Sequence, residues 1–123
     1  GLIPDAGGTW SLTKLLGRAR AMGLALTGEP ISATKASEWG LIWNVFPRDK
    51  LLNEAVKIVE KLAKGPTFGY GKTKIAINEA DNNSFKKQLE LEAKLQGECG
   101  DTQDYAEGVR AFLEKRPPEF KGK

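Results

Sequence analysis

Apolar residues recur three and four positions apart through the second half of the chain, which is the spacing of an amphipathic helix. Gly-Pro and Pro-Pro pairs interrupt this pattern and mark where helices end. The helices predicted for this half are 51–63, about 67–80, about 84–97 with Ser84 as its cap, and one that starts at Asp101, Thr102 or Asp104 and ends before Pro117. No strand is predicted there.

The first 47 residues carry shorter apolar stretches between glycines. Three helices are predicted: one from a cap at Thr9 to Gly17, one over 18–26, and one from a cap at Ser32 to Gly40. Residues 41–46 are β-branched and aromatic, which favours a short strand closed by Pro47. The chain is therefore expected to be mainly α, with about six helices and at most one or two short strands.

Composition then narrows the class of protein. The 123 residues are 40% hydrophobic and 28% charged, which is ordinary for a globular domain, and the net charge is only +3. So small and evenly spread a charge disfavours nucleic acid or a membrane surface as the partner. No apolar run reaches the roughly 20 residues of a membrane span. A soluble, unexported protein is expected.

Cysteine and histidine usage excludes several chemistries. Cys99 is the single cysteine, which rules out an internal disulfide and fits a reducing cytoplasm, the expected location. With no histidine, these residues cannot form a Ser-His-Asp triad or most zinc sites, so no metal is expected. The chemistry must come from other side chains.

Asp5 is the first candidate for chemistry. It follows an apolar pair and a proline, and precedes Gly7 and Gly8, which allow the backbone to come close to a ligand. Turns between a strand and a helix often carry the functional groups of α/β proteins. The residue pattern alone leaves an alternative open: Asp5 could simply cap the following helix.

Two other segments invite a functional interpretation. Residues 65–73 resemble a phosphate-binding loop superficially, but Pro66 stands where that loop needs glycine, so we interpret them as a connection between helices with a solvated Lys72. Phe112 and Lys115 lie three apart in a predicted helix, which would place an aromatic ring and an ammonium on one face. That pair suits an adenine and a phosphate, although plain packing explains it as well.

Taken together, several runs resemble the crotonase (enoyl-CoA hydratase/isomerase) family. They follow one another in the family's order and spacing over essentially the whole chain, which makes the resemblance more specific than any single motif. The runs are GLIPDAGGT at 1–9, GRARA at 17–21, LTGEPISA at 26–33, ASEWGLI at 36–42 and EGVRAFLEKR at 107–116. Within the family, the runs PDAGGTW and ASEWGLIW are most similar to the branch that isomerises a ring-epoxidised phenylacetyl-CoA.

The resemblance implies an architecture. The chain would be the C-terminal part of the crotonase-like α/β fold, with residues 1–47 as the end of the ββα core and 48–123 as the helical region that builds a trimer, often paired into a hexamer. Nearly all of the ββα core would be missing, and Gly1 is not an initiator methionine, so we expect a fragment. The family's oxyanion hole would lie in the missing part, leaving this chain inactive alone.

The resemblance also implies site residues. Isomerases of the family place one carboxylate at this turn, so Asp5 would move a proton on the acyl group of a coenzyme A thioester. Ile3, Pro4, Gly7 and Trp10 would bind the substrate around it. Phe112 and Lys115 would cover the adenine and phosphate of coenzyme A, which enters as part of the substrate and not as a bound cofactor.

Three other functions stay open. Hydratases of the family use two glutamates and carry glycine where Asp5 stands, which argues against hydration without excluding an enoyl-CoA hydratase. Aryl-CoA dehalogenases use a nucleophilic aspartate with a histidine base, and this chain has no histidine. The chain could also act only as a helical oligomerisation module without activity.

Overall fold

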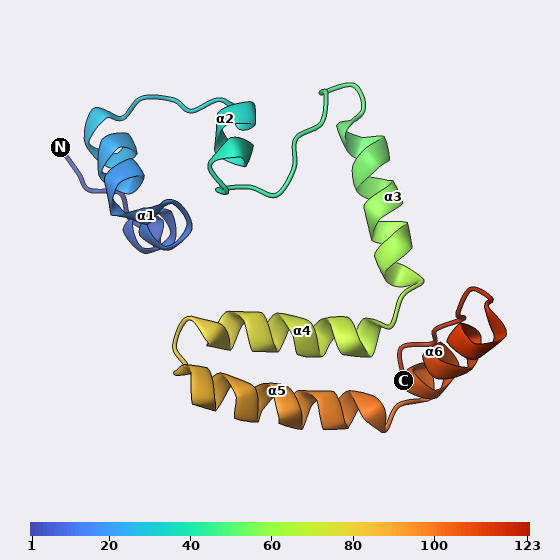
Figure 1. Ribbon diagram of the computed structural model, residues 1–123. Helices are drawn as coiled ribbons and strands as arrows, with labels where there is room; N and C mark the ends of the chain where they lie inside the picture. Colours follow the sequence, from blue (N-terminus) through green and yellow to red (C-terminus); the bar gives the residue numbers. More distant parts are fainter. The chain divides into compact units, whose positions relative to one another are not determined.

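The computed structural model describes residues 1–123 as six helices and no strand (Figure 1). The helices are α1 (Gly8–Thr27), α2 (Ala33–Glu38), α3 (Leu51–Ala63), α4 (Thr67–Ala80), α5 (Phe85–Gly100) and α6 (Gln103–Glu114). The predicted mainly helical character is confirmed, and α3 and α4 have the bounds that the apolar spacing predicts. None of the six combines the length and apolarity of a membrane-spanning helix.

The predicted strand at 41–46 is wrong. Residues 41–43 form bends and residues 44–46 have no regular secondary structure, and the N–H of Leu41 donates to the carbonyl of Ala36 at 2.9 Å, so the stretch begins by closing α2. Gly40, where the helix was predicted to end, makes that closure possible with a left-handed φ of 81°. β-branched and aromatic residues favour a strand only where a neighbouring strand pairs with it, and these 123 residues supply none.

The chain divides into two compact units, residues 1–52 and 53–123. The sequence-based boundary after residue 47 lies five residues earlier. The first unit contains α1 and α2, and the second contains nearly all of α3 together with α4, α5 and α6. The roles predicted for the two segments, core end and trimerisation region, stay predictions.

In the first unit, α1 is broken at Gly17. Its φ of 74° and ψ of 165° are not helical, so the two helices predicted on either side of Gly17 follow one another with a kink between them. The predicted cap at Thr9 is wrong, because Gly7 occupies that position and Thr9 is already helical. Ser32 caps α2 as predicted, its hydroxyl accepting from the N–H of Lys35 at 3.2 Å.

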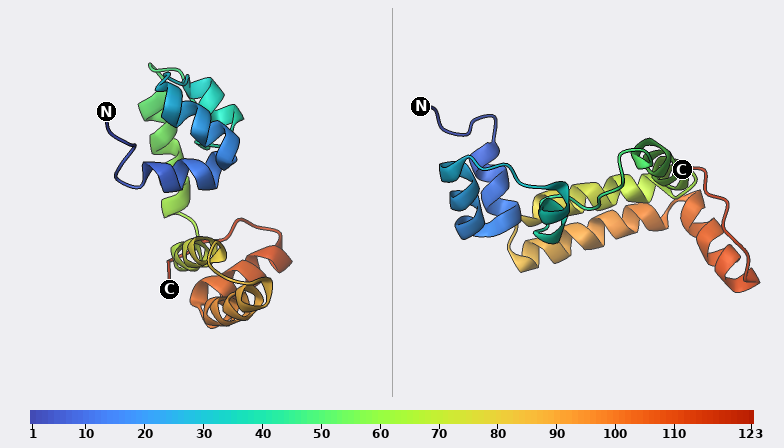
Figure 2. Two further views of the ribbon diagram at one scale, coloured as in Figure 1. Left: turned by 90° about the vertical axis from the view of Figure 1, so that its left-hand side faces the viewer. Right: turned by 90° about the horizontal axis from the view of Figure 1, so that it is seen from above.

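In the second unit, α4 and α5 run antiparallel side by side (Figures 1 and 2). Lys72 of α4 forms an ion pair with Glu98 of α5 and lies 4.8 Å from the centre of the Phe68 ring. At the other end of the pair, the amide of Gln88 donates to the carbonyl of Ala76 at 3.0 Å. Lys72 is thus a partly buried cross-link between helices, contrary to the solvated lysine expected from sequence.

The predicted caps of the last two helices are confirmed. Ser84 accepts from the N–H of Lys87 at the start of α5, and Thr102 accepts from the N–H of Tyr105 at the start of α6. Helix α5 continues to Gly100, three residues beyond the predicted end. Among the three residues considered for the cap of α6, the structure selects Thr102.

Few apolar side chains are buried within these 123 residues. The buried ones are Leu16, Ala21 and Ala36 in the first unit and Leu95 and Ala111 in the second. Larger apolar side chains on α3, such as Leu52 and Val59, are mostly exposed. Exposed apolar faces of this kind are typical of surfaces that contact another protein, a membrane or a ligand.

Replacing Gly17 with alanine is expected to lower the free energy of unfolding by about 1–3 kcal/mol, because φ of 74° strains any residue with a Cβ atom. Gly23→Ala is the matched control. Neither added Cβ meets an atom within 4 Å, but Gly23 has no left-handed backbone and should gain about 0.5–1 kcal/mol as alanine. Denaturant unfolding of both variants measures the difference, and equal effects would contradict the role of the kink.

Candidate functional site

Asp5 lies at the first corner of a tight turn that leads directly into α1. The carbonyl of Asp5 accepts from the N–H of Gly8 at 2.8 Å, and both central residues are left-handed, with φ of 49° at Ala6 and 84° at Gly7. Positive φ at both positions is the mark of a type I′ turn, which glycine tolerates and alanine does not favour. The strained residue, Ala6, stands next to the candidate carboxylate.

The carboxylate of Asp5 does not cap α1. The cap is Gly7, with no side-chain hydrogen bond, and Asp5 contacts the helix start only through its backbone. Its side chain is exposed within this chain. The alternative that Asp5 is simply a helix cap is therefore contradicted, and its carboxylate remains available for chemistry.

The predicted substrate-binding residues are near Asp5 in the sequence, on both sides of it. Ile3 and Pro4 precede Asp5, Gly7 is the second left-handed residue of the turn, and Trp10 lies in the first turn of helix α1. Ile3 is 78% exposed and Trp10 61% exposed. The ammonium of Lys14 lies 5.6 Å from the centre of the Trp10 ring. These apolar side chains are uncovered around Asp5, and their contact with an acyl group stays a prediction.

Phe112 and Lys115 lie at the end of α6. Phe112 is 82% exposed and lines a largely apolar groove of about 570 Å³ with side chains of α4, α5 and α6 and with Phe120. The helix ends at Glu114, and Lys115 has a left-handed φ of 53°. The expectation that both residues share one face of a continuous helix is therefore wrong, because Lys115 belongs to the turn that ends it.

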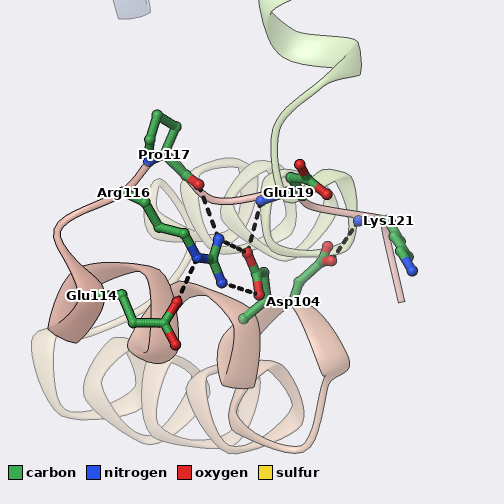
Figure 3. A network of polar contacts seen from close by, with 7 residues as sticks. Asp104, Glu114, Arg116, Pro117, Glu119 and Lys121 are labelled. Carbon is green, nitrogen blue, oxygen red and sulfur yellow. Dashed lines mark hydrogen bonds and ion pairs between the residues drawn. The ribbon is translucent and has the colours of Figure 1, made fainter.

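Sequence reasoning missed a network that fastens the last residues to α6 (Figure 3). The carboxylate of Asp104 is buried and accepts from the backbone N–H groups of Lys121 at 2.6 Å and Gly122 at 2.8 Å. The sequence pattern indicates Asp104 only as a possible helix cap. Its real partners are 17 and 18 residues away and are backbone groups, so no local pattern indicates them.

Glu107 and Arg116 form the centre of this network. The two carboxylate oxygens of Glu107 accept from both terminal nitrogens of the guanidinium, at 2.6 and 3.0 Å, and one of them also accepts from the N–H of Glu119 at 3.0 Å. Arg116 also donates from Nε to the carboxylate of Glu114 at 2.6 Å and from Nη1 to the carbonyl of Pro117 at 3.1 Å. The hydrogen bonds from Arg116 and Glu119 lower the pKa of the Glu107 carboxyl from 4.5 to about 2.

The family model for enoyl-CoA hydratase/isomerase matches residues 1–123. The chain belongs to this family, the crotonase family. A 1,2-epoxyphenylacetyl-CoA isomerase of Escherichia coli is 53% identical over the whole chain, and a probable enoyl-CoA hydratase of Rhodobacter capsulatus is 47% identical. The chain covers 47% and 48% of these proteins, about half of their length.

Solved structures show the same relation. An enoyl-CoA hydratase of Bacillus anthracis matches the whole chain with a TM-score of 0.93 and 37% identity, and the chain covers 48% of it. The predicted fold class, the mainly helical C-terminal part of the crotonase-like fold, is confirmed. The six helices are therefore those of the C-terminal part of the crotonase-like fold.

Replacing Asp5 with asparagine is expected to leave the free energy of unfolding within about 0.5 kcal/mol, because its carboxylate makes no hydrogen bond in the chain. Ser32→Ala is the control in the same unit. It removes a cap that the structure does contain, and should cost about 1 kcal/mol. Thermal unfolding compares the two, and a loss at Asp5 as large as at Ser32 would mean that Asp5 has a structural role.

The stabilising effect of Glu107 is expected to depend on acid pH. Its pKa is lower in the folded protein than the ordinary 4.5, so its contribution is complete above about 4.5 and disappears as the pH falls toward about 2. The difference in unfolding free energy between wild type and Glu107→Gln should therefore shrink over that range. Glu119→Gln, whose side chain makes no hydrogen bond, should show no such trend. A difference independent of pH would contradict the ion pair.

Proposed function

We propose that this chain forms part of an acyl-CoA isomerase in which Asp5 moves a proton beside the thioester. The observation that carries the proposal is the turn at Asp5, which holds a carboxylate at the start of α1 without using it as a cap. The 53% identity to an isomerase of 1,2-epoxyphenylacetyl-CoA supports the same reaction class. By that likeness, phenylacetate degradation is the proposed setting.

One carboxylate can serve this reaction as both base and acid. A carbon next to a thioester is only moderately acidic, and backbone N–H groups that bind the thioester oxygen stabilise the enolate formed when the proton leaves. The carboxylate of Asp5 takes the proton from one position and returns it to another, so the product is an isomer and no group is lost. With an epoxidised ring, the protonated carboxyl assists opening of the epoxide.

The coenzyme A end of the substrate is assigned to Phe112 and Lys115. An exposed aromatic ring offers a face for adenine, and an ammonium outside any ion pair offers a charge for phosphate. We place the substrate-binding role of Ile3, Pro4, Gly7 and Trp10 around the acyl group. No metal or separate cofactor enters the reaction as proposed.

The whole protein is proposed to act as a homo-oligomer, a trimer or hexamer in the cytoplasm. Exposed apolar faces on α3 and other helices support burial against further protein. The 123 residues alone are expected to be inactive, because the donors of the oxyanion hole lie outside them. A helical module without any activity is the alternative, and it requires these residues to self-associate in a light-scattering measurement.

Enoyl-CoA hydration is the second candidate function. The relative from Rhodobacter capsulatus, 47% identical, carries the name of a probable enoyl-CoA hydratase. Hydration adds water across a double bond, whereas isomerisation moves the bond or opens the ring without water. Incorporation of ¹⁸O from labelled water into the product would identify a hydratase.

Asp5→Asn in the full-length protein is expected to lower kcat on 1,2-epoxyphenylacetyl-CoA or a 3-enoyl-CoA by about a hundredfold or more, because asparagine keeps the shape and cannot accept the proton. Conversion of the thioester, followed by chromatography, measures the loss.

Asp49→Asn is the matched control, since it also replaces an exposed aspartate in the first unit. It should leave kcat unchanged. An Asp5→Asn variant as active as this control would remove Asp5 from the mechanism.

A further inference from the structure

Lys115 has a backbone conformation that a lysine avoids. With Ala6 it is one of the two residues other than glycine that have positive φ. A left-handed residue with a Cβ atom is strained, and such strain persists only where the surroundings fix it. The contacts that fix Lys115 therefore indicate what the turn is built to present.

Backbone hydrogen bonds fix the first part of the turn. The N–H of Arg116 donates to the carbonyl of Ala111 at 3.0 Å, and the N–H of Lys115 donates to that of Phe112 at 3.3 Å. This pair of bonds is the Schellman arrangement, which normally uses glycine at the left-handed position. Lysine in that place keeps the turn and adds an ammonium group.

Side chains fix the second part. Arg116 follows Lys115 directly, and its guanidinium is held by Glu107 through two bonds and by Glu114 through a third. Glu107 stands on α6, two turns before the end of the helix, so the pair joins the body of the helix to the residue after the turn. Bidentate pairs of this kind fix orientation as well as distance.

The charges around the turn leave Lys115 as its free cation. Arg116 is engaged by both acidic side chains that face it, and the acidic Asp104 is engaged by backbone N–H groups. Lys115 makes no ion pair and is exposed. Its ammonium is thus available to an anionic ligand, and it is not neutralised by the neighbouring carboxylates.

We propose that Glu107 and Arg116 are positioning residues for the nucleotide end of the acyl-CoA. By locking the left-handed turn after α6, they hold the Lys115 ammonium ready for a phosphate of coenzyme A. This inference rests on the proposed function, in which Lys115 contacts that phosphate. Glu107 and Arg116 do not touch the substrate and act through Lys115 alone.

A double-mutant cycle in the full-length protein tests the inference. The variants are Glu107→Gln, Lys115→Ala and their combination, assayed on a coenzyme A thioester and on the pantetheine thioester of the same acyl group, which lacks the nucleotide. Glu107→Gln should raise KM for the coenzyme A thioester about tenfold, with kcat and the pantetheine KM unchanged. When Lys115 is already alanine, adding Glu107→Gln should not raise this KM further.

Two further variants sharpen the cycle. Glu119→Gln removes a carboxylate charge from the neighbouring tail without breaking a side-chain bond, and should leave both KM values unchanged. Arg116→Lys keeps the charge and loses the two-pronged contact, so it should reproduce Glu107→Gln even if that variant folds poorly.

The possible outcomes distinguish a failure of the positioning role from a failure of the proposed function on which it rests. If Glu107→Gln raises KM for both thioesters, or raises it equally with and without Lys115, the positioning role is wrong while the proposed function stands. If Lys115→Ala itself leaves KM for the coenzyme A thioester unchanged, the assigned phosphate contact fails, and the inference fails with it. The reaction assigned to Asp5 is tested separately by its own variant.

Discussion

A left-handed backbone at a residue with a side chain is the constraint on which both candidate sites depend. Ala6 adopts it beside Asp5, and Lys115 adopts it at the end of α6. Each such residue costs roughly 1–2 kcal/mol relative to a right-handed one. Local hydrogen bonds offset that cost, through Gly8 to Asp5 at one turn and through the Schellman pair at the other. The positions of Asp5 and Lys115 therefore follow from how well their turns are held.

Helix periodicity and the caps of α2, α5 and α6 could be predicted from the sequence because both are local, whereas the cap predicted at Thr9 was wrong because α1 starts from the left-handed Gly7. The caps Ser32, Ser84 and Thr102 each accept a hydrogen bond from the backbone N–H three residues later, so both partners fall within a short stretch of sequence. Whether residues 41–46 form a strand could not be predicted from local pattern, because a strand requires a second strand to pair with. Lys115 was misplaced because the end of a helix depends on which residue turns left-handed, and lysine rarely does.

The candidate sites divide along the same line. Asp5 was found from its glycine turn together with the family resemblance, and only the structure shows that its carboxylate is not a cap. The network of Asp104, Glu107 and Arg116 escaped sequence reasoning because its partners lie 9 to 18 residues apart. Charge alternates so often along this chain that composition does not single out one pair among many.

The hydrogen bonds between the Asp104 carboxylate and the tail limit how the sequence of the tail can vary between related proteins. A carboxylate that binds main-chain N–H groups does not distinguish one side chain from another at position 121, where the lysine side chain is exposed. Position 122 is different, because the left-handed φ of 74° at Gly122 strains any residue with a Cβ atom, and that atom would also meet the Thr67 hydroxyl. Side chains should thus vary freely at position 121 and be restricted at position 122, while deletions between α6 and the tail should be disfavoured, because a shorter chain could not reach Asp104.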